Sequence, residues 1–235
     1  MMRISRIRRY PIKGLAGEDL SRLELSAGAR VPLDRRYALS CDDRLIGLSE
    51  DARLARFSAA VSCDRHLTLY RDGVPIAEGS IERDGGLAQV ERALSQHFAG
   101  ESIGRLRIVS TELTQAVDET KPVSLINLAT LEELGSLLGE KPDLRRFRAN
   151  LYLEGLPASR ELEWLGAELI VGTARLRVTE PTARCKMINV DPERAVADVN
   201  IPRAMMKALG HALCGVYGEV VTSGRIAVGD TVELA

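Results

Sequence analysis

The sequence, 235 residues long, contains no apolar run that approaches the roughly 20 residues needed to cross a membrane. Charged residues interrupt the apolar residues of its N-terminus, which therefore lacks the apolar stretch of a signal peptide. Acidic and basic residues nearly cancel, to a formal net charge of −1, so no bulk electrostatic attraction to nucleic acid is expected. These absences predict a cytoplasmic protein that binds neither a membrane nor a nucleic acid.

Common metal-binding and nucleotide-binding signatures are also missing. The four cysteines, Cys41, Cys63, Cys185 and Cys214, form no CxxC pair, which argues against a structural zinc site and against an iron–sulfur cluster. The three histidines lack ligand spacing, and the sequence has no GxSxG motif, no P-loop and no GxGxxG followed by an acidic residue. We expect the cysteines to be reduced, cytosolic thiols.

The composition is that of a globular protein with an uneven distribution of charge. Apolar residues make up 45% and charged residues 28%, which excludes a disordered chain. The length suffices for one large domain or for two of about 100 residues each. Residues 1–36 hold nine arginines or lysines against four acids. Because this excess is local, a small anion explains it better than a polymer does.

Short strands separated by turns dominate the first part of the chain. Strands are predicted at residues 23–25, 37–39, 66–70, 74–77 and 106–109. The spacing of Leu87, Val90, Leu94 and Phe98 predicts one helix among them. Residues 111–122 are polar and weakly patterned, so we place a domain boundary there.

The second part begins with a helix that Ser124 or Asn127 caps and Gly139 ends. A later helix starts near Pro202. It is expected to bury the apolar residues Met205, Met206, Leu209 and Leu213. Strands are predicted at residues 150–153, 168–171, 174–178, 216–221, 226–228 and 232–234. This closing series of strands favours a barrel or a sandwich over a doubly wound parallel sheet.

Two N-terminal segments could bind an anion. In residues 10–14 (YPIKG), a rigid strand end places Lys13 beside a glycine that permits close backbone approach. By itself this pattern is also that of a strand followed by a turn. In residues 34–37 (DRRY), adjacent arginines point to opposite faces of a strand, so that one can face inward as an anion clamp.

Residues 143–150 (DLRRFRAN) place several guanidinium groups beside Asn150, ahead of an apolar strand. Such groups suit a phosphate or a carboxylate, although a solvated basic loop is the commoner use of such a run. The helix start at Asn127 offers backbone N–H groups that favour an anion. Simple capping explains Asn127 equally well.

Cys185 lies in residues 181–192 (PTARCKMINVDP), between Arg184 and Lys186. Flanking cations favour the thiolate form of a cysteine, which nucleophilic and metal-ligand chemistry require. A lone cysteine is more commonly buried and inert, and this is the expectation for the other three.

These segments, in this order, resemble the motifs of the MOSC family. Residues 10–14 resemble its YPxK motif and residues 34–37 its DRxW stretch, both in the N-terminal β-barrel domain. Residues 124–131 are similar to the family's helix start, residues 146–150 to its RFRPN motif, and residues 184–192 to its RCxxTTVDP signature. The ending, with GVYGEV at 215–220 and GRIAVGD at 224–230, is similar to the family's FGVYAEV and GxIxVGD. The resemblance covers essentially the whole chain.

The resemblance implies an α+β fold, mainly β, with two β-barrel-like domains and a few short helices. We expect the MOSC N-terminal β-barrel domain at residues 1–115 and the MOSC domain at residues 116–235. The family includes the mitochondrial amidoxime-reducing components, which hold molybdenum on a pterin dithiolene with one protein cysteine. By this resemblance Cys185 is the metal ligand and the catalytic residue. The cofactor-binding residues it implies are Lys13, Arg35, Asn127, Arg148 and Asn150.

The function implied is the reduction of N–O or S–O bonds of small molecules by the molybdenum cofactor (molybdopterin). With no appended ferredoxin domain expected, electrons would come from a separate donor protein, such as a ferredoxin- or cytochrome-type reductase. An alternative is a sulfur-carrier or cofactor-handling protein that uses a Cys185 persulfide. MOSC domains also occur fused to pyridoxal-phosphate-dependent sulfurases, but no such domain is expected in this sequence. A third hypothesis is a cofactor-free binding module. The sequence does not predict the oligomeric state.

Several positions depart from the family's motifs. Gly14 replaces a common serine, Ala149 the proline of RFRPN, and Asn189 a threonine. After Pro192, Glu-Arg-Ala stands where Glu-Thr-Gly is usual. Three of these positions border the expected pocket, so either the substrate chemistry differs or cofactor binding is weaker.

Overall fold

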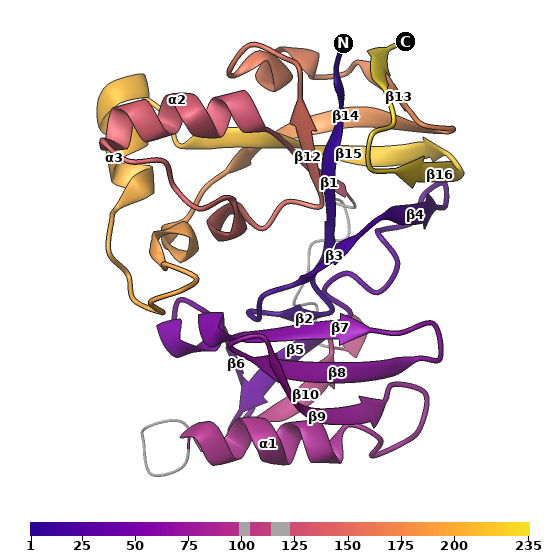
Figure 1. The fold of residues 1–235 in the computed structure, drawn as a ribbon, viewed down its shortest axis with the longest axis vertical. Coiled ribbons are helices and arrows are strands. Elements are labelled where there is room, and N and C mark those ends of the chain that lie inside the picture. Colours follow the sequence, from indigo (N-terminus) through magenta and orange to yellow (C-terminus); the bar gives the residue numbers. More distant parts are fainter. Residues whose placement is uncertain (99–103, 114–122) are drawn as a thin grey trace.

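A computed structural model describes residues 1–98, 104–113 and 123–235. Figure 1 shows two β-rich parts, one above the other; we call the upper part the large half and the lower part the small half. The fold class predicted from the sequence, α+β with mainly β structure in curled sheets, is confirmed. The predicted division at residues 115 and 116 lies outside the described residues, so it stays a prediction.

An eight-stranded sheet forms most of the large half. In spatial order its strands are β17 (Val232–Leu234), β13 (Glu168–Val171), β14 (Ala174–Ala183), β15 (Leu213–Thr222), β11 (Val123–Asn127), β12 (Leu151–Glu154), β1 (Arg3–Arg9) and β3 (Glu18–Leu20). All neighbouring pairs are antiparallel except β11 with β12. A ribbon of β4 (Arg22–Leu25) and β16 (Gly224–Ala227) adjoins this sheet. N-terminal strands therefore complete a sheet built mainly from C-terminal ones.

The first strand, β1, leads the chain from the large half to the junction of the two halves. Figure 1 shows β1 running from the end of the large half where both termini lie down to the junction of the halves. Its residues Ile4 and Ile7 are buried in the core of the large sheet. Since β1 ends at the junction, the residues that follow it, 10–15, are placed between the two halves.

Two helices cover one end of the large half (Figure 1). The first, α2 (Leu128–Leu138), begins at Asn127, whose side chain accepts the N–H of Ala129, and ends at Gly139 with a left-handed φ of 82°. The second, α3 (Ile201–Leu209), begins after Asn200. The prediction of Asn127 and Gly139 as the ends of α2 is confirmed, whereas Ser124, the alternative cap, lies inside β11.

The buried face predicted for α3 is partly wrong. Ile201 and Met205 are buried, but Met206 and Leu209 are about half exposed. Leu213 lies beyond the helix, as the first residue of β15. The apolar spacing is helical, yet the neighbouring elements cover only the first turns of α3.

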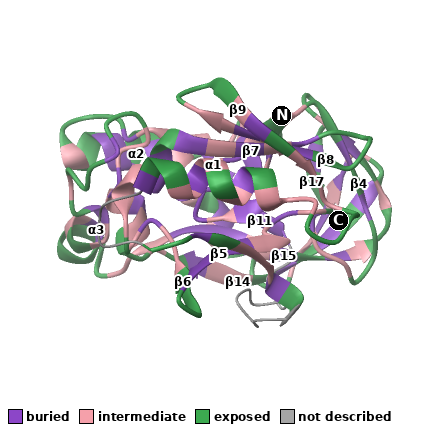
Figure 2. Cartoon of the chain, turned by 90° about the horizontal axis from the view of Figure 1, so that it is seen from below, coloured by how far each residue is buried: buried purple, intermediate pink, exposed green. Residues whose placement is uncertain are grey.

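The small half contains two further sheets. One comprises β10 (Arg107–Ser110), β5 (Tyr37–Cys41), β2 (Ile12–Lys13) and β6 (Arg44–Ile46), and the other β7 (Phe57–Val61), β8 (His66–Arg71) and β9 (Val74–Ser80). The helix α1 (Ala88–Phe98) contacts β9 and buries Val90, Leu94 and Phe98, as its spacing predicts. Figure 2 shows exposed and buried residues alternating along α1, which is expected of a helix that covers a sheet.

Among the residues that the structure describes, five short 3₁₀ helices connect these elements: η1 (Ala52–Arg56), η2 (Thr111–Leu113), η3 (Leu144–Phe147), η4 (Arg160–Trp164) and η5 (Lys186–Asn189). Residues just after Cys185 join the halves, because Val190 and Ala195 belong to the core of the small half and Met187 packs against it. Within the described ranges, no helix combines the length and the apolar character that a membrane span needs.

Candidate functional site

Two predicted anion-binding residues, Arg35 and Arg148, meet with Arg8 around the ring of Tyr10, which is fully buried at the junction. The guanidinium carbons of Arg148, Arg35 and Arg8 lie 4.5, 5.0 and 5.6 Å from the ring centroid. The phenol of Tyr10 donates to the carbonyl of Ala149 at 3.3 Å. The electron-rich ring faces favour nearby cations, but the three cations repel one another in a poorly solvated place. The cluster therefore carries an excess of positive charge.

Asp34 and Arg148 hold Arg35 in place. It has a left-handed φ of 50° in the turn before β5, so it does not lie in a strand as predicted. It forms an ion pair with Asp34, which also accepts the N–H of Tyr10 at 2.8 Å. Its Nη2 donates to the carbonyl of Arg148 at 2.9 Å. Burial disfavours the charge of Arg35, but the Asp34 carboxylate together with the phenols of Tyr10 and Tyr217 outweighs burial and raises the pKa of Arg35. Arg36 instead forms an exposed ion pair, so the two arginines do point to different surroundings.

Lys13 ends β2 close to Arg35. Burial and then the charge of Arg35 lower the pKa of Lys13, and the carboxylate of Glu50 opposes this effect. A hydrogen bond from Ser49 lowers the pKa of Glu50 most, and the charge of Lys186 lowers it further. Because Lys186 directly follows Cys185, the Glu50 carboxylate lies within electrostatic range of both the Lys13 end of the site and the Cys185 end.

Arg148 has a donor that the protein does not use. The residue is 8% exposed and adopts a left-handed φ of 54°. Its Nη1 donates to the carbonyl of Leu15 at 2.6 Å, whereas its Nη2 is buried and has no hydrogen-bond partner among the described residues. Burial, followed by the charge of Arg35, lowers the pKa of Arg148 to about 10. A buried cation with an unused donor is a group that an incoming anion would satisfy.

Cys185 is exposed and immediately precedes η5. The residue before it, Arg184, donates from Nη1 to the carbonyl of Phe147 at 2.8 Å and from Nε to the carbonyl of Cys214 at 2.8 Å. Phe147 is the direct neighbour of Arg148 in the chain. These contacts bring the predicted metal ligand and the predicted phosphate ligand onto adjoining segments.

The segment after Cys185 closes the inner side of this region. Met187 and Val190 line a cavity of about 20 Å³ together with Tyr10 and Arg148. A cavity of this size can hold one water molecule but no pterin. A larger ligand must therefore bind on the solvent side, where Cys185 is exposed.

The arginines of residues 143–150 are divided between the site and the protein's own carboxylates. Arg146 is buried and pairs with Asp191 and Asp198 at 2.9 and 2.8 Å. Arg145 pairs with Glu193 at 2.8 Å on the surface. The run does bind carboxylates, as its composition suggests, but two of its three arginines bind carboxylates that the fold itself supplies.

Asn150 is used inside the large sheet. Its Oδ1 accepts the backbone N–H and the hydroxyl of Ser124 at 3.1 and 2.8 Å, and its Nδ2 donates to the carbonyl of Arg8 at 3.2 Å. It is 1% exposed and links β1 and β11 to the start of β12. Its predicted role toward a cofactor stays a prediction, and the structure gives it this other role.

Asn127 is likewise used by the protein. Its Oδ1 accepts the N–H of Ala129 at 3.1 Å, and its Nδ2 donates to the carbonyl of Pro157 at 2.6 Å. The fully buried carboxylate of Glu161 lies at the start of α2, where it accepts the hydroxyl of Thr130 at 2.8 Å and the N–H of Asn127 at 3.4 Å. An internal anion thus stands where the sequence suggested an external one, and the role predicted for Asn127 remains untested.

Three positions that depart from the family's motifs have local structural roles. Gly14 has a φ of 94°, and a Cβ there would lie 3.1 Å from neighbouring backbone. The N–H of Ala149 donates to the hydroxyl of Tyr152 at 3.2 Å, which a proline could not do. The side chain of Asn189 accepts the first N–H of α3 at 3.0 Å. The departures therefore match contacts of this chain's own backbone.

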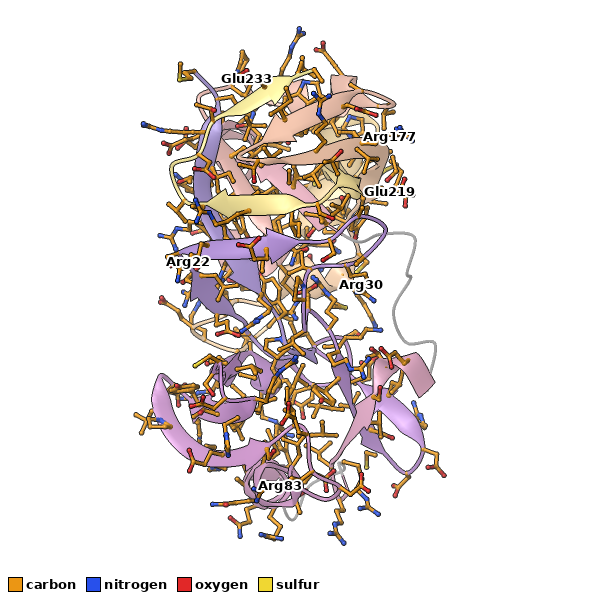
Figure 3. All side chains as sticks on the ribbon, turned by 90° about the vertical axis from the view of Figure 1, so that its right-hand side faces the viewer. Arg22, Arg30, Arg83, Arg177, Glu219 and Glu233 are labelled. Carbon is orange, nitrogen blue, oxygen red and sulfur yellow. The ribbon has the colours of Figure 1, made fainter. Side chains whose placement is uncertain are left out.

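The basic excess of residues 1–36 does not form one patch. Figure 3 shows Arg22 on the surface of the large half and Arg30 near the junction. Arg8 and Arg35 surround Tyr10. Sequence reasoning assigned no role to Tyr10, Glu50 or Glu161. Only Tyr10 belongs to a segment singled out in the sequence. The charges that connect Glu50 to the site, Lys13 and Lys186, are distant in the chain, and so are the partners of Glu161.

Comparison with known families gives two matches. Residues 1–105 match the MOSC N-terminal beta barrel domain, and residues 96–233 match the MOSC domain. The solved structure of the YUAD protein from Bacillus subtilis superposes over 100% of this chain and 96% of that one, with a TM-score of 0.53 and 13% sequence identity. This similarity supports the fold alone.

Curated relatives match about half of this chain. "Mitochondrial amidoxime reducing component 2" of Bos taurus is 28% identical over 131 residues, which cover 50% of this chain and 38% of that protein. "Mitochondrial amidoxime-reducing component 1" of Homo sapiens is 28% identical over 131 residues, covering 51% and 38%. The matched region is thus well under half the length of these relatives. Since the domain matches extend from residue 1 to residue 233, the chain belongs to the MOSC domain family and combines the family's N-terminal barrel domain with the MOSC domain itself.

Proposed function

We propose that this protein binds the molybdenum cofactor at the junction of its halves, with the phosphate of molybdopterin held by Lys13, Arg35 and Arg148 and the metal bound by Cys185. The observation that carries the proposal is the state of Arg148. Its guanidinium is buried beside another cation, its pKa is lowered, and its Nη2 has no partner among the described residues. A phosphate monoester would supply the missing charge and acceptors.

The residues present fit the chemistry of this cofactor. A phosphate with a charge near −2 needs several cations before it leaves water, and the Tyr10 cluster provides them from both halves. A thiolate is a soft ligand that suits a metal held by sulfur, and the exposed Cys185 can offer one on the solvent side. Of the remaining predicted residues, Asn150 would fix the backbone next to Arg148, and Asn127 would fix the start of α2.

We further propose that the protein reduces N-hydroxylated or S-oxide small molecules. The support is the similarity to proteins named amidoxime-reducing components, which covers only part of those proteins. The bound cofactor would supply two-electron chemistry for removing the substrate oxygen as water. Two electrons would come from a separate ferredoxin- or cytochrome-type donor, in a cytoplasmic setting. This chain would hold the cofactor through its basic cluster and leave the exposed Cys185 side open to the substrate.

Metal analysis tests the proposal. The protein should be purified from a host that synthesises the cofactor and compared with Cys185→Ser and Arg148→Met. We expect close to one molybdenum per wild-type chain and almost none in either variant, with Cys63→Ser as a control because that thiol is also exposed. Oxidation of a reduced viologen dye by an N-hydroxylated compound then tests turnover. Wild-type protein that contains no molybdenum contradicts the proposal.

A sulfur-carrier function is the alternative, and the exposure of Cys185 favours it, since a carrier must offer its thiol to a donor. In that case purified protein should carry one extra sulfur atom on Cys185, detected by mass spectrometry and removed by a reductant, without molybdenum. Purified protein that carries neither a metal nor a persulfide would favour a cofactor-free binding module. The three functions therefore give different results in the same two measurements.

A further inference from the structure

The short turn η3 carries Arg146 and is directly followed by Arg148, the proposed anion-binding residue. Arg146 of this turn has a side chain that is only 4% exposed. Its Nη1 donates to the carbonyl of Asn189 at 2.9 Å and to Oδ1 of Asp198 at 2.8 Å. Its Nη2 donates to Oδ2 of Asp191 at 2.9 Å and to Oδ2 of Asp198 at 2.8 Å. One guanidinium thus binds three points of the segment that follows Cys185.

That segment is itself ordered by hydrogen bonds, so a contact at one point acts on the whole. Oδ1 of Asp191 accepts the backbone N–H groups of Glu193 and Arg194 at 2.9 and 2.7 Å. The side chain of Asn189 accepts the N–H of Ile201 at 3.0 Å, which fixes the start of α3. Fixing Asp191 and Asn189 therefore fixes the chain on the C-terminal side of Cys185.

The N-terminal side of Cys185 is attached to the same turn. Arg184 donates to the carbonyl of Phe147, the residue next to Arg146, at 2.8 Å. Its guanidinium carbon also lies 5.5 Å from the centroid of the Phe147 ring. Cys185 is therefore held between two attachments, one on each side, and both lead to η3.

Arg148 follows directly on that turn and is fixed independently. Its carbonyl accepts Arg35 at 2.9 Å, and its Nη1 donates to Leu15 at 2.6 Å. The proposed metal ligand and the proposed phosphate ligand are thus placed relative to each other through three consecutive residues.

We propose that Arg146 is a positioning residue, which sets where the Cys185 sulfur lies relative to the basic cluster of Lys13, Arg35 and Arg148. This inference rests on the proposed function, in which the two sites hold one ligand. A planar guanidinium fork can bind both oxygens of Asp198 and still reach Asp191, whereas a lysine ammonium binds as a point charge. Arg146→Lys keeps the charge and removes this geometry.

The test uses metal-free full-length protein and the chemistry of the Cys185 thiol. Iodoacetate is an anion and iodoacetamide is neutral, so the ratio of their alkylation rates reports the positive charge around a thiol. In the wild type the ratio at Cys185 should be about tenfold higher than at Cys63, which is exposed next to Asp64. In Arg146→Lys we expect the ratio at Cys185 to fall toward that of Cys63.

Arg145→Lys is the matched control, since Arg145 lies on the same turn but pairs with Asp143 of that turn and with the exposed carboxylate of Glu193, where ion pairs contribute little. It should keep the wild-type ratio. Hydrogen exchange is the second measurement. Amides of residues 186–200 should exchange about tenfold faster in Arg146→Lys, while those of β11 and β15 keep their wild-type rates, which separates a local effect from general unfolding.

An unchanged alkylation ratio in Arg146→Lys overturns the inference, and so does a wild-type ratio at Cys185 no higher than that at Cys63. Faster exchange that also appears in β11 and β15 overturns it as well, because Arg146 would then act on the whole fold. None of these measurements needs a bound cofactor. Absence of molybdenum from the wild-type protein would count against the proposed function alone.

Discussion

Arg146 and Arg148 are two residues apart, and we predict that their replacement by methionine changes stability in opposite directions. In the metal-free protein, Arg148→Met should leave the free energy of unfolding unchanged or raise it. Arg146→Met should lower it strongly. The two substitutions remove the same chemical group from the same short turn, so differences in helix propensity or in side-chain size do not explain a difference in sign.

The magnitudes follow from the surroundings of each guanidinium. Burial and Arg35 lower the pKa of Arg148 to about 10, and at about 1.4 kcal/mol per pKa unit the charge costs about 3 kcal/mol. Removing it leaves the carbonyl of Leu15 without its donor, a loss of about 1–3 kcal/mol. The expected balance lies between zero and about 2 kcal/mol of stabilisation. Removal of Arg146 instead takes the buried partner from Asp191 and Asp198, which keep only the exposed Arg194, at a cost of about 3–5 kcal/mol.

The pH dependence of the same variant provides an independent check. Below a pH of about 10 Arg148 is charged in both states, so its destabilising effect is fully present. As the pH rises through the lowered pKa of the folded state, the folded protein releases this proton first and the effect declines. The stability difference between Arg148→Met and wild type should therefore shrink as the pH rises above about 10.

Urea unfolding at equilibrium, with equal m-values for all three proteins, provides these free energies. The two variants should differ by at least about 3 kcal/mol at neutral pH. If Arg148→Met loses as much stability as Arg146→Met, the charge of Arg148 is well satisfied within the protein. This site would then not require an anion.

Three further outcomes test other parts of the structure. Burial raises the pKa of Glu161, so its ionised form lowers the stability of the fold above that pKa. Glu161→Gln should therefore raise the midpoint of thermal unfolding at about pH 7 and not at about pH 4. A lower midpoint at neutral pH would contradict this. Gly14→Ser restores the family's residue but places a Cβ at a φ of 94°. Urea unfolding should show that the free energy of unfolding falls by about 1–2 kcal/mol. An unchanged free energy would mean that serine fits this turn without strain. Burial raises the pKa of Cys214 to about 11, so peptide mass spectrometry after mild iodoacetamide treatment should find Cys185 labelled and Cys214 not, and equal labelling would show that Cys214 is accessible.

Most elements of the fold follow from local signals in the sequence. The Asp72–Gly73 turn between β8 and β9 is an example, since both residues have a positive φ and the strands beside it are where their apolar patterns predict. The strand β11 had no such signal. All five of its residues are buried and it pairs with a parallel neighbour, so its sequence lacks the alternation that marks a strand with one exposed face. Such a strand becomes recognisable only from its neighbours in the sheet.

The sequence indicates several residues of the candidate site, but not the partners that surround them in the fold. Motif resemblance selects Lys13, Arg35 and Arg148, and the structure brings these residues together. The local composition alone does not separate Arg148 from Arg146, because the carboxylates that occupy Arg146 lie 45 and 52 residues further along the chain. Availability for a ligand depends on partners that only the folded chain supplies.

The destabilising charge at the site is consistent with a binding role. Arg148 is fixed by Leu15 and Arg35 before any ligand arrives, so little ordering of this side chain accompanies binding. An anion that pairs with its Nη2 would remove the cost of about 3 kcal/mol, which corresponds to about a hundredfold tighter binding than at a site without this repulsion. The same anion should therefore stabilise the wild type more than Arg148→Met, and by a margin of that order. An inorganic phosphate titration followed by thermal unfolding measures this margin, and equal stabilisation of both proteins would place the anion elsewhere.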